Sequence, residues 1–302
     1  MPVVRQRILA AFLARNELLA QAQMLTAMSD AHAMARLWAD YTIARAKLSS
    51  IQPLPTTAPD LRPLPSTAQS HLDQVEASDS FQEAFGGFGY RFQLVPIDKL
   101  TPIQTFCNLE PEISPPVSDD VLAGLEYALP KDPVVQGEVM ITPTGVRFSS
   151  TRYGMGLQHV RRRIREGKVV LSLEHPNLVQ VRRFGNALVL ANGTHRAFEM
   201  ARNGMTHTPA IVIEHRNPAE FECPTGPGFF NPQFLIASPR QPLQGARPPL
   251  LPDFLTELAV ECPVNVLPSI IDLNIGPPQA RQEPGAQQIA IQLGGLVPQP
   301  AP

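Results

Sequence analysis

A short stretch in the second half of the sequence combines the features of an anion-binding site. An apolar run at 187–191 leads into the dipeptide Asn192-Gly193, and the residues that follow have helical spacing. Because a strand that enters a helix through a tight turn directs several unpaired backbone N–H groups to one point, this junction predicts a phosphate site. The candidate ligand-binding residues at the junction are Asn192, Gly193, Thr194, His195 and Arg196.

Two of these side chains strengthen the prediction. His195 and Arg196 lie at the positive end of the expected helix dipole, where a cation costs a few tenths to about 1 kcal/mol. A bound phosphate would reverse that penalty. The alternative is that Arg196 turns outward and pairs with Glu199, three residues further along the helix, while His195 stays neutral. The residues of the turn leave both interpretations open.

The elements that position this turn are predicted from local signals. Gly185-Asn186 between two apolar runs is typical of a two-residue hairpin turn, so a hairpin is expected over 178–191. The helix that begins at Thr194 is expected to end at Gly204, which supplies a left-handed stop. A short apolar strand at 209–213 follows. The expected unit is therefore hairpin, tight turn, helix and strand.

These residues resemble a known group. Gly193-Thr194-His195-Arg196, followed by Gly204 and the strand at 208–212, is similar in order and spacing to the turn, helix and strand of the ParB/sulfiredoxin-like fold. A second segment, Phe92–Gln104, is similar to the opening strand of that group and its "Val-Pro-Ile-x-x-Leu-x-Pro-x-Gln" motif. The resemblance covers 90–104 and 176–214. It implies an α+β fold with a small mixed-sheet core, and a nucleotide or phosphate site that includes Gln104.

The chain departs from that group at two chemically important positions. Sulfiredoxins carry a reactive cysteine where this chain has Thr194, so the resemblance does not extend to sulfinic acid repair. Kinase-like relatives have a catalytic carboxylate where this chain has Gln104, and an amide cannot act as a general base. Asp98 and Glu110 are the carboxylates nearest in sequence to that position. The resemblance therefore implies a phosphate cradle without its catalytic group.

Three function hypotheses from different classes follow. The first is a phosphate- or nucleotide-binding module that acts as a ligand-gated switch or a weak nucleotide hydrolase, with a nucleoside triphosphate and Mg²⁺ as the implied cofactor. The second is a phosphotransferase with an unidentified carboxylate. The third is an interaction protein that keeps the fold without a ligand. DNA is not a favoured partner, because nothing after Cys223 resembles the helix-turn-helix domain of partition proteins.

Composition limits the remaining classes. The 302 residues carry 25 basic and 27 acidic side chains, which gives a net charge of −2. The chain therefore lacks the excess of positive charge that is typical of nucleic-acid-binding proteins. The three cysteines lack the spacing of a zinc site or a disulfide framework, and the histidines form no metal motif. No apolar run is long enough to span a membrane. We expect a cytoplasmic protein without a metal site.

The composition changes along the chain predict four segments. They are a helical hairpin at 1–50, broken near Ser29, a Pro-rich linker at 51–79, the ParB/sulfiredoxin-like domain at 80–222, and a Pro-rich C-terminal extension at 223–302. The apolar stripes of the first segment, which include Trp38 and Tyr41, suggest packing on the main domain or a homodimer through residues 1–50.

Three further elements are expected inside or beside the main domain. Ser118–Leu129 is predicted to be a helix opened by Ser118-Asp119-Asp120, and 137–148 is predicted to be a hairpin. Residues 158–168 have a helical pattern with five basic residues on the outer face. That face could bind a nucleotide or a DNA backbone, or be an ordinary solvated surface.

Overall fold

The computed structural model describes residues 3–25, 31–51, 58–109, 115–116, 120–131, 138–142, 145–150, 160–165, 168–173, 178–217, 220–221, 226, 228–231, 235, 247–265, 269–274 and 289–290. Contacts divide the chain into two compact units. The larger unit comprises Pro2–Lys131 and Asn177–Asn265, and the smaller one comprises Met1, Asp132–Pro176 and Val266–Pro302. The fold class is α+β, as predicted from the sequence.

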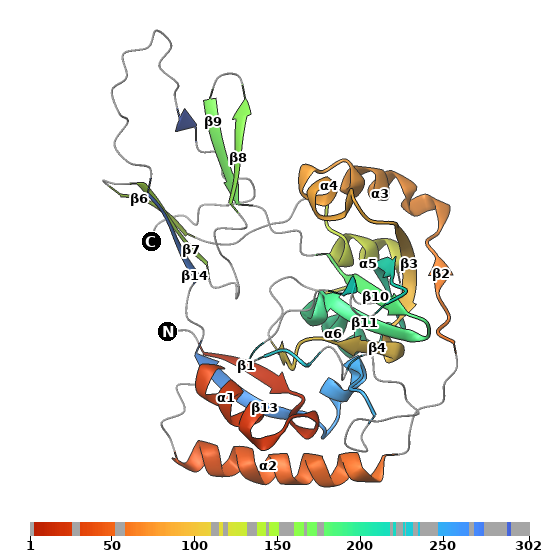
Figure 1. Cartoon of the computed structure of the whole chain (residues 1–302), viewed down its shortest axis with the longest axis vertical. Coiled ribbons are helices and arrows are strands. Elements are labelled where there is room, and N and C mark those ends of the chain that lie inside the picture. The colour runs from red at the N-terminus through yellow and green to blue at the C-terminus, as the bar shows by residue number, and fades with distance from the viewer. Residues whose placement is uncertain are drawn as a thin grey trace. The chain divides into compact units, whose positions relative to one another are not determined.

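The larger unit is built on a six-stranded mixed sheet with the order β2-β3-β12-β10-β11-β4 (Figure 1). These strands are β2 Arg62–Pro63, β3 Tyr90–Pro96, β4 Leu100–Pro102, β10 Gln180–Phe184, β11 Ala187–Asn192 and β12 His207–Glu214. The predicted hairpin is β10 and β11, joined by Gly185-Asn186. The pairs β10–β12 and β11–β4 are parallel, and the others are antiparallel.

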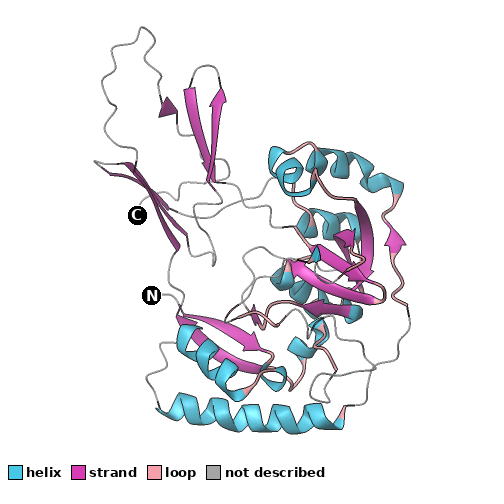
Figure 2. Cartoon of the chain, in the orientation of Figure 1, coloured by secondary structure: helices cyan, strands magenta, loops and turns pink. Residues whose placement is uncertain are grey.

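Helices cover this sheet and complete its core (Figure 2). They are α3 Gln69–Glu76, α4 Asp79–Phe85, α5 Val121–Ala128 and α6 Thr194–Arg202, with short 3₁₀ turns η2 Ser66–Ala68 and η3 Ile97–Lys99. In α4, the buried Phe81 ring lies 5.8 Å from Phe92 of β3, at stacking distance. The helix predicted at 118–129 is α5, and Asp120 caps it by accepting a hydrogen bond from Leu122 N–H at 2.9 Å.

The N-terminal segment differs from the predicted helical hairpin. Val3–Ile8 is strand β1, the central strand of a sheet with the order β13-β1-β5, where β5 is Phe106–Asn108 and β13 is Val260–Asn265. The helix prediction is wrong here because both partner strands are remote in sequence, and this pairing overrides local helical composition. The predicted helices are confirmed further along, as α1 Arg15–Leu25 and α2 Ala31–Ser50. Ser29 lies outside the described residues.

The apolar side chains of α2 pack against other elements of the larger unit. α2 packs against β13 and the turn η1, Ala10–Phe12 (Figure 1). The Tyr41 hydroxyl donates to Leu13 O at 3.2 Å, and the Trp38 and Tyr41 rings meet edge to face at 5.8 Å. The homodimer through residues 1–50 stays a prediction.

Two segments predicted as Pro-rich linkers contribute packed structure. The predicted linker contains α3, whose Leu72 and Val75 are buried and whose His71 Nε2 lies 2.7 Å from Leu129 O. The predicted C-terminal extension contains β13 and the 3₁₀ helix η7, Leu251–Leu255. Proline density was a poor guide because Pro252 lies in the first turn of η7 and Pro263 lies in β13, an edge strand, and proline is tolerated at both kinds of position.

The smaller unit contains two small sheets. One has the order β14-β7-β6, built from Ser269–Asn274, Gly145–Ser150 and Glu138–Thr142, and it includes the predicted hairpin. The other has the order β15-β9-β8, built from Ile289–Ala290, Lys168–Leu173 and Val160–Arg165. The predicted helix at 158–168 is therefore wrong, because Val160–Arg165 pairs as a strand with Lys168–Leu173.

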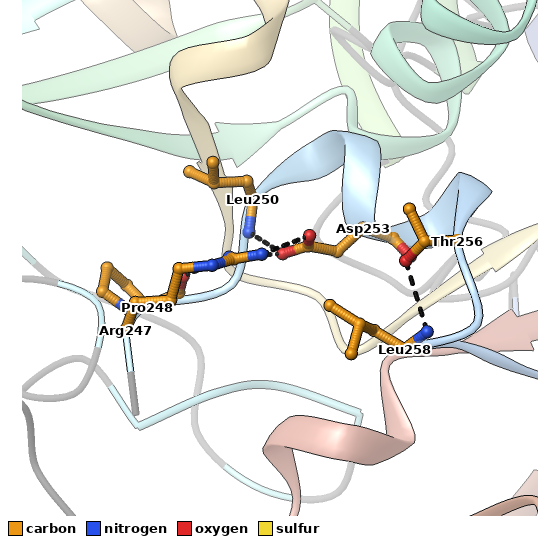
Figure 3. Close-up of polar contacts among 6 residues, drawn as sticks. All are labelled: Arg247, Pro248, Leu250, Asp253, Thr256 and Leu258. Carbon is orange, nitrogen blue, oxygen red and sulfur yellow. Dashed lines mark hydrogen bonds and ion pairs between the residues drawn. The ribbon is translucent and has the colours of Figure 1, made fainter. Parts of the chain in front are cut away.

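A buried ion pair fixes the chain just before β13 (Figure 3). Arg247 donates from Nη1 to Asp253 Oδ2 at 2.7 Å and from Nη2 to Oδ1 at 2.6 Å, and the two side chains are 8% and 7% exposed. Asp253 Oδ2 also accepts from Leu250 N–H at 2.7 Å, which caps η7. The guanidinium lies 5.5 Å from the Phe12 ring of η1. This pair therefore connects the C-terminal part of the larger unit to the N-terminal turn.

Deletion of residues 1–13 should remove the cooperative unfolding transition of the larger unit. The deletion takes out the central strand of a sheet and the fully buried Ile8 and Leu9, and it exposes the edges of β5 and β13. Thermal unfolding followed by circular dichroism measures this. A truncated chain that melts like the full chain would show that the N-terminal segment is a separable attachment.

Substitution Asp253→Ala should cost about 3–5 kcal/mol of unfolding free energy, because it leaves the Arg247 guanidinium buried without its carboxylate. The matched control is Asp60→Ala, since Asp60 pairs at 2.6 Å with Arg62 and both side chains are more than half exposed. That change should cost less than about 1 kcal/mol. Urea denaturation compares the two, and equal losses would mean that burial does not set the strength of the Arg247 pair.

Candidate functional site

The predicted turn lies at the junction of β11 and α6. Gly193 is the N-terminal cap of α6 and has a φ of 82°, in the left-handed region. A Cβ at this position would lie 2.8 Å from Val179 Cα, so both conformation and space require glycine. Val179 is itself fixed, because its N–H donates to Ala128 O at 3.0 Å and its carbonyl accepts from Ile211 N–H at 2.9 Å. The turn is thus held against α5 and β12.

Thr194 is the first residue of α6 and is 1% exposed. Its hydroxyl is buried and has no hydrogen-bond partner among the described residues. The first intrahelical hydrogen bond runs from Ala197 N–H to Gly193 O at 2.9 Å, so the N–H of Thr194 precedes the helical ladder. A buried hydroxyl without a partner costs about 1–3 kcal/mol, and a ligand that accepts its proton would recover that cost. Thr194 is one of the ligand-binding residues predicted from the sequence.

The cationic side chains of the turn make contacts within the chain. Arg196 is 7% exposed, and its Nη1 donates to Tyr127 O in the last turn of α5 at 2.7 Å. The guanidinium also lies 5.7 Å from the Tyr127 ring. Glu199 Oε1 lies 3.5 Å from Arg202 Nη1. His195 is partly exposed, with its ring 5.9 Å from that of Phe106. Arg196 therefore joins α6 to α5.

Asn192 and Gln104 lie at the same edge of the sheet. Asn192 Oδ1 accepts from Gly193 N–H at 2.7 Å, so one donor of the turn is already bonded. β4 runs parallel to β11 with Pro102 opposite Leu190. The ladder does not continue to Gln104, because Ile103 O accepts from Phe230 N–H at 2.8 Å. Gln104 also forms an isolated antiparallel bridge with Phe229. The structure thus brings together the two segments on which the sequence resemblance rested.

Asp98 and Glu110 are the carboxylates that the sequence offers near Gln104. Asp98 lies in η3, before the start of β4, roughly 20 Å along the chain from Gln104 at 3.3 Å per residue, and it pairs with Lys99. Glu110 lies outside the described residues. Glu199 is a buried carboxylate of α6 that sequence reasoning assigned only to an ion pair, and it is 3% exposed.

A thiol lies next to the turn. The Sγ of Cys107 in β5 is 4.0 Å from Thr194 O, and the side chain is fully buried. Burial, and to a lesser extent the charge of Glu199, raises the pKa of the Cys107 thiol well above its ordinary value. The thiol therefore stays protonated at neutral pH and does not supply a thiolate nucleophile to the turn.

The described residues contain no group of three or more histidine, cysteine, aspartate or glutamate side chains that could hold a metal ion. Nor is any helix among them sufficiently long and apolar to cross a bilayer. No family model matches the chain, and no curated protein or solved structure is significantly similar to it. The likeness to the ParB/sulfiredoxin-like group stays a prediction, and function must be argued from the geometry.

Substitution Gly193→Ala should destabilise the protein by about 3 kcal/mol or more, because it adds a backbone clash to the cost of about 1–2 kcal/mol for a left-handed alanine. Gly185→Ala is the matched control. Gly185 has a φ of 58°, but a Cβ there meets nothing within 4 Å. Gly185→Ala should therefore lose only the stability that a left-handed alanine costs, about 1–2 kcal/mol. Chemical denaturation of both variants measures the difference, and similar losses would contradict the close approach to Val179.

Proposed function

We propose that the protein binds a phosphate-bearing ligand at the start of α6 and acts as a ligand-gated binding module. The observation that carries this proposal is the buried hydroxyl of Thr194, which has no described partner and lies at the first residue of the helix. The N-terminus of a helix attracts negative charge through its unpaired N–H groups and its dipole. A phosphate oxygen that accepts from Thr194 would use both features.

A nucleotide is the ligand class to test first. The sequence resemblance implies a nucleoside triphosphate with Mg²⁺, and the turn can supply donors to its phosphates. The ion would be carried by the phosphates themselves, since Mg²⁺ in such sites retains several waters and few protein ligands. Gln104, which follows β4, offers an amide that can donate to a phosphate oxygen or accept from a sugar hydroxyl.

Ligand binding rather than catalysis fits the described residues best. Proton abstraction from an attacking oxygen needs a base within hydrogen-bond reach, and the resemblance implies a carboxylate in that role. The position implied by the resemblance holds Gln104, and Asp98 lies at the opposite end of β4. Phosphoryl transfer can proceed slowly by positioning and charge stabilisation alone. We therefore propose that nucleotide hydrolysis, where it occurs, is slow, and that the bound state itself is the signal.

A second candidate function is that of an interaction protein that keeps the turn without a ligand. Two contacts favour it. Arg196 is committed to Tyr127 O, and the Gly193 N–H is bonded to Asn192 Oδ1. Both groups were expected to face a phosphate, and both have internal partners. The two candidates differ in one property, which is whether Thr194 acquires a partner when phosphate compounds are added.

Substitution Thr194→Val tests the proposal. Valine replaces the hydroxyl by a methyl group of similar shape, so the unliganded variant should be as stable as the wild type or more so. ATP, ADP, CTP, GTP, pyrophosphate and inorganic phosphate are screened by thermal shift. A compound at about 100 times its dissociation constant should stabilise the wild type by about 2.7 kcal/mol. Thr194→Val should bind it about tenfold more weakly, since a hydrogen bond to a charged group contributes about 1.5–3 kcal/mol.

The control is Thr208→Val, because the Thr208 hydroxyl is equally buried but donates to Pro209 O at 3.1 Å. This variant should lose about 1 kcal/mol of stability and keep the full ligand response. A wild-type protein that no phosphate compound stabilises at millimolar concentration would exclude the binding module in favour of the second candidate. An undiminished response in Thr194→Val would exclude Thr194 as a contact.

A further inference from the structure

The C-terminal end of α5 is a junction at which hydrogen bonds from three other elements meet. The last carbonyl groups of a helix have no partner within the helix itself, so they accept from elsewhere. Tyr127 O accepts from Arg196, in the first turn of α6, at 2.7 Å. Ala128 O accepts from Val179 N–H, just before β10, at 3.0 Å, and Leu129 O accepts from a side chain of α3 at 2.7 Å. This end of α5 therefore holds α3, the start of β10 and the first turn of α6 together.

The chain passes to the smaller unit and back at this same junction. It enters the smaller unit after Lys131, three residues beyond Ala128, and returns at Asn177, two residues before Val179. The hydrogen bond between Ala128 and Val179 therefore joins the two connections to each other inside the larger unit. Both of these anchoring residues are fully buried. The two connections thus start from fixed points of the core.

The first turn of α6 contacts this junction on two sides. Gly193 lies against Val179, since a Cβ added to Gly193 would be 2.8 Å from Val179 Cα. Arg196 is bonded to Tyr127 O in the last turn of α5. Thr194, which carries the proposed function, lies between Gly193 and Arg196 in the sequence. Because packed interiors have low compressibility and transmit strain, a shift of this turn is passed to both connections.

We propose that the smaller unit is the part of the protein that responds to the phosphate site. A ligand at the start of α6 changes the conformational stability of strands β6 to β9, and the change passes through Val179 and the end of α5. The inference rests on the proposed function, because it needs a ligand at Thr194. The route is short, since 132–137 separate Lys131 from β6 and 174–177 separate β9 from Leu178. Because coupling between two sites is reciprocal, a partner of the smaller unit should alter phosphate affinity by the same factor.

The test is amide hydrogen exchange of the full chain, measured by mass spectrometry with and without each of the six phosphate compounds of the thermal-shift screen. A compound that binds should slow exchange in 138–150 and 160–173 by about fivefold or more, the lower end of ordinary allosteric couplings. Exchange should slow because a ligand that holds the turn also restrains both anchoring residues. If no compound binds, this inference and the proposed function fail together. Binding with unchanged exchange in both segments would overturn this inference alone.

Longer connections should abolish the response of the smaller unit without affecting binding. A Gly-Ser-Gly-Ser insertion after Lys131, combined with one after Pro176, leaves every described hydrogen bond of the junction in place. The matched control carries the same insertion after Asn265, where the chain passes between the two units a third time, from the end of β13. The control should keep the response. A response that survives the double insertion, or that the control insertion also abolishes, would overturn the proposed route.

A comparison without ligand tests the same route should the insertions prevent folding. Gly193→Ala and Asp253→Ala have comparable predicted losses of stability, but only Gly193→Ala presses on Val179. Gly193→Ala should therefore speed exchange in 138–150 and 160–173 by about fivefold more than Asp253→Ala does. Equal exchange in the two variants would mean that the smaller unit follows only the overall stability of the larger one, and it would overturn the inference.

Discussion

The close approach of Gly193 to Val179 is the constraint on which the central part of the structure depends. Val179 is hydrogen-bonded to the end of α5 on one side and to β12 on the other. Only glycine fits here, because an added Cβ would lie 2.8 Å from Val179 Cα and because the turn from β11 into α6 needs the left-handed conformation. The direction of α6, and with it the position of the Thr194 hydroxyl, follows from this contact.

The local signals of the sequence predicted the elements around this turn well. Gly185-Asn186, Gly193 and Gly204 each have a positive-φ glycine where a turn or a helix end was expected. These signals succeed because they depend on backbone conformation, which the residue type constrains directly. β4 also pairs with β11, so the strands that carry the two motifs are neighbours in the sheet.

The elements that could not be predicted depend on contacts between distant parts of the chain. Val3–Ile8 forms a strand because β5 and β13 lie on either side of it, and no local pattern reveals those partners. The helical pattern at 158–168 is overridden by pairing with 168–173 in the same way. Arg196, within the site, also makes a contact with a residue that is distant in the sequence. Its spacing suggested either a phosphate or Glu199, and no local pattern revealed its contact with a carbonyl of α5, 69 residues earlier.

The account rests on Thr194 acquiring a partner when a phosphate-bearing ligand binds. The most direct measurement is the backbone amide resonance of Thr194 in a ¹⁵N–¹H spectrum during titration with nucleotides and pyrophosphate. The account predicts a saturable downfield shift of the Thr194 amide proton, with smaller changes in β4, as expected for a new hydrogen bond to a charged oxygen. A spectrum in which the Thr194 amide does not move while the ligand binds elsewhere, or in which no ligand binds, would contradict it.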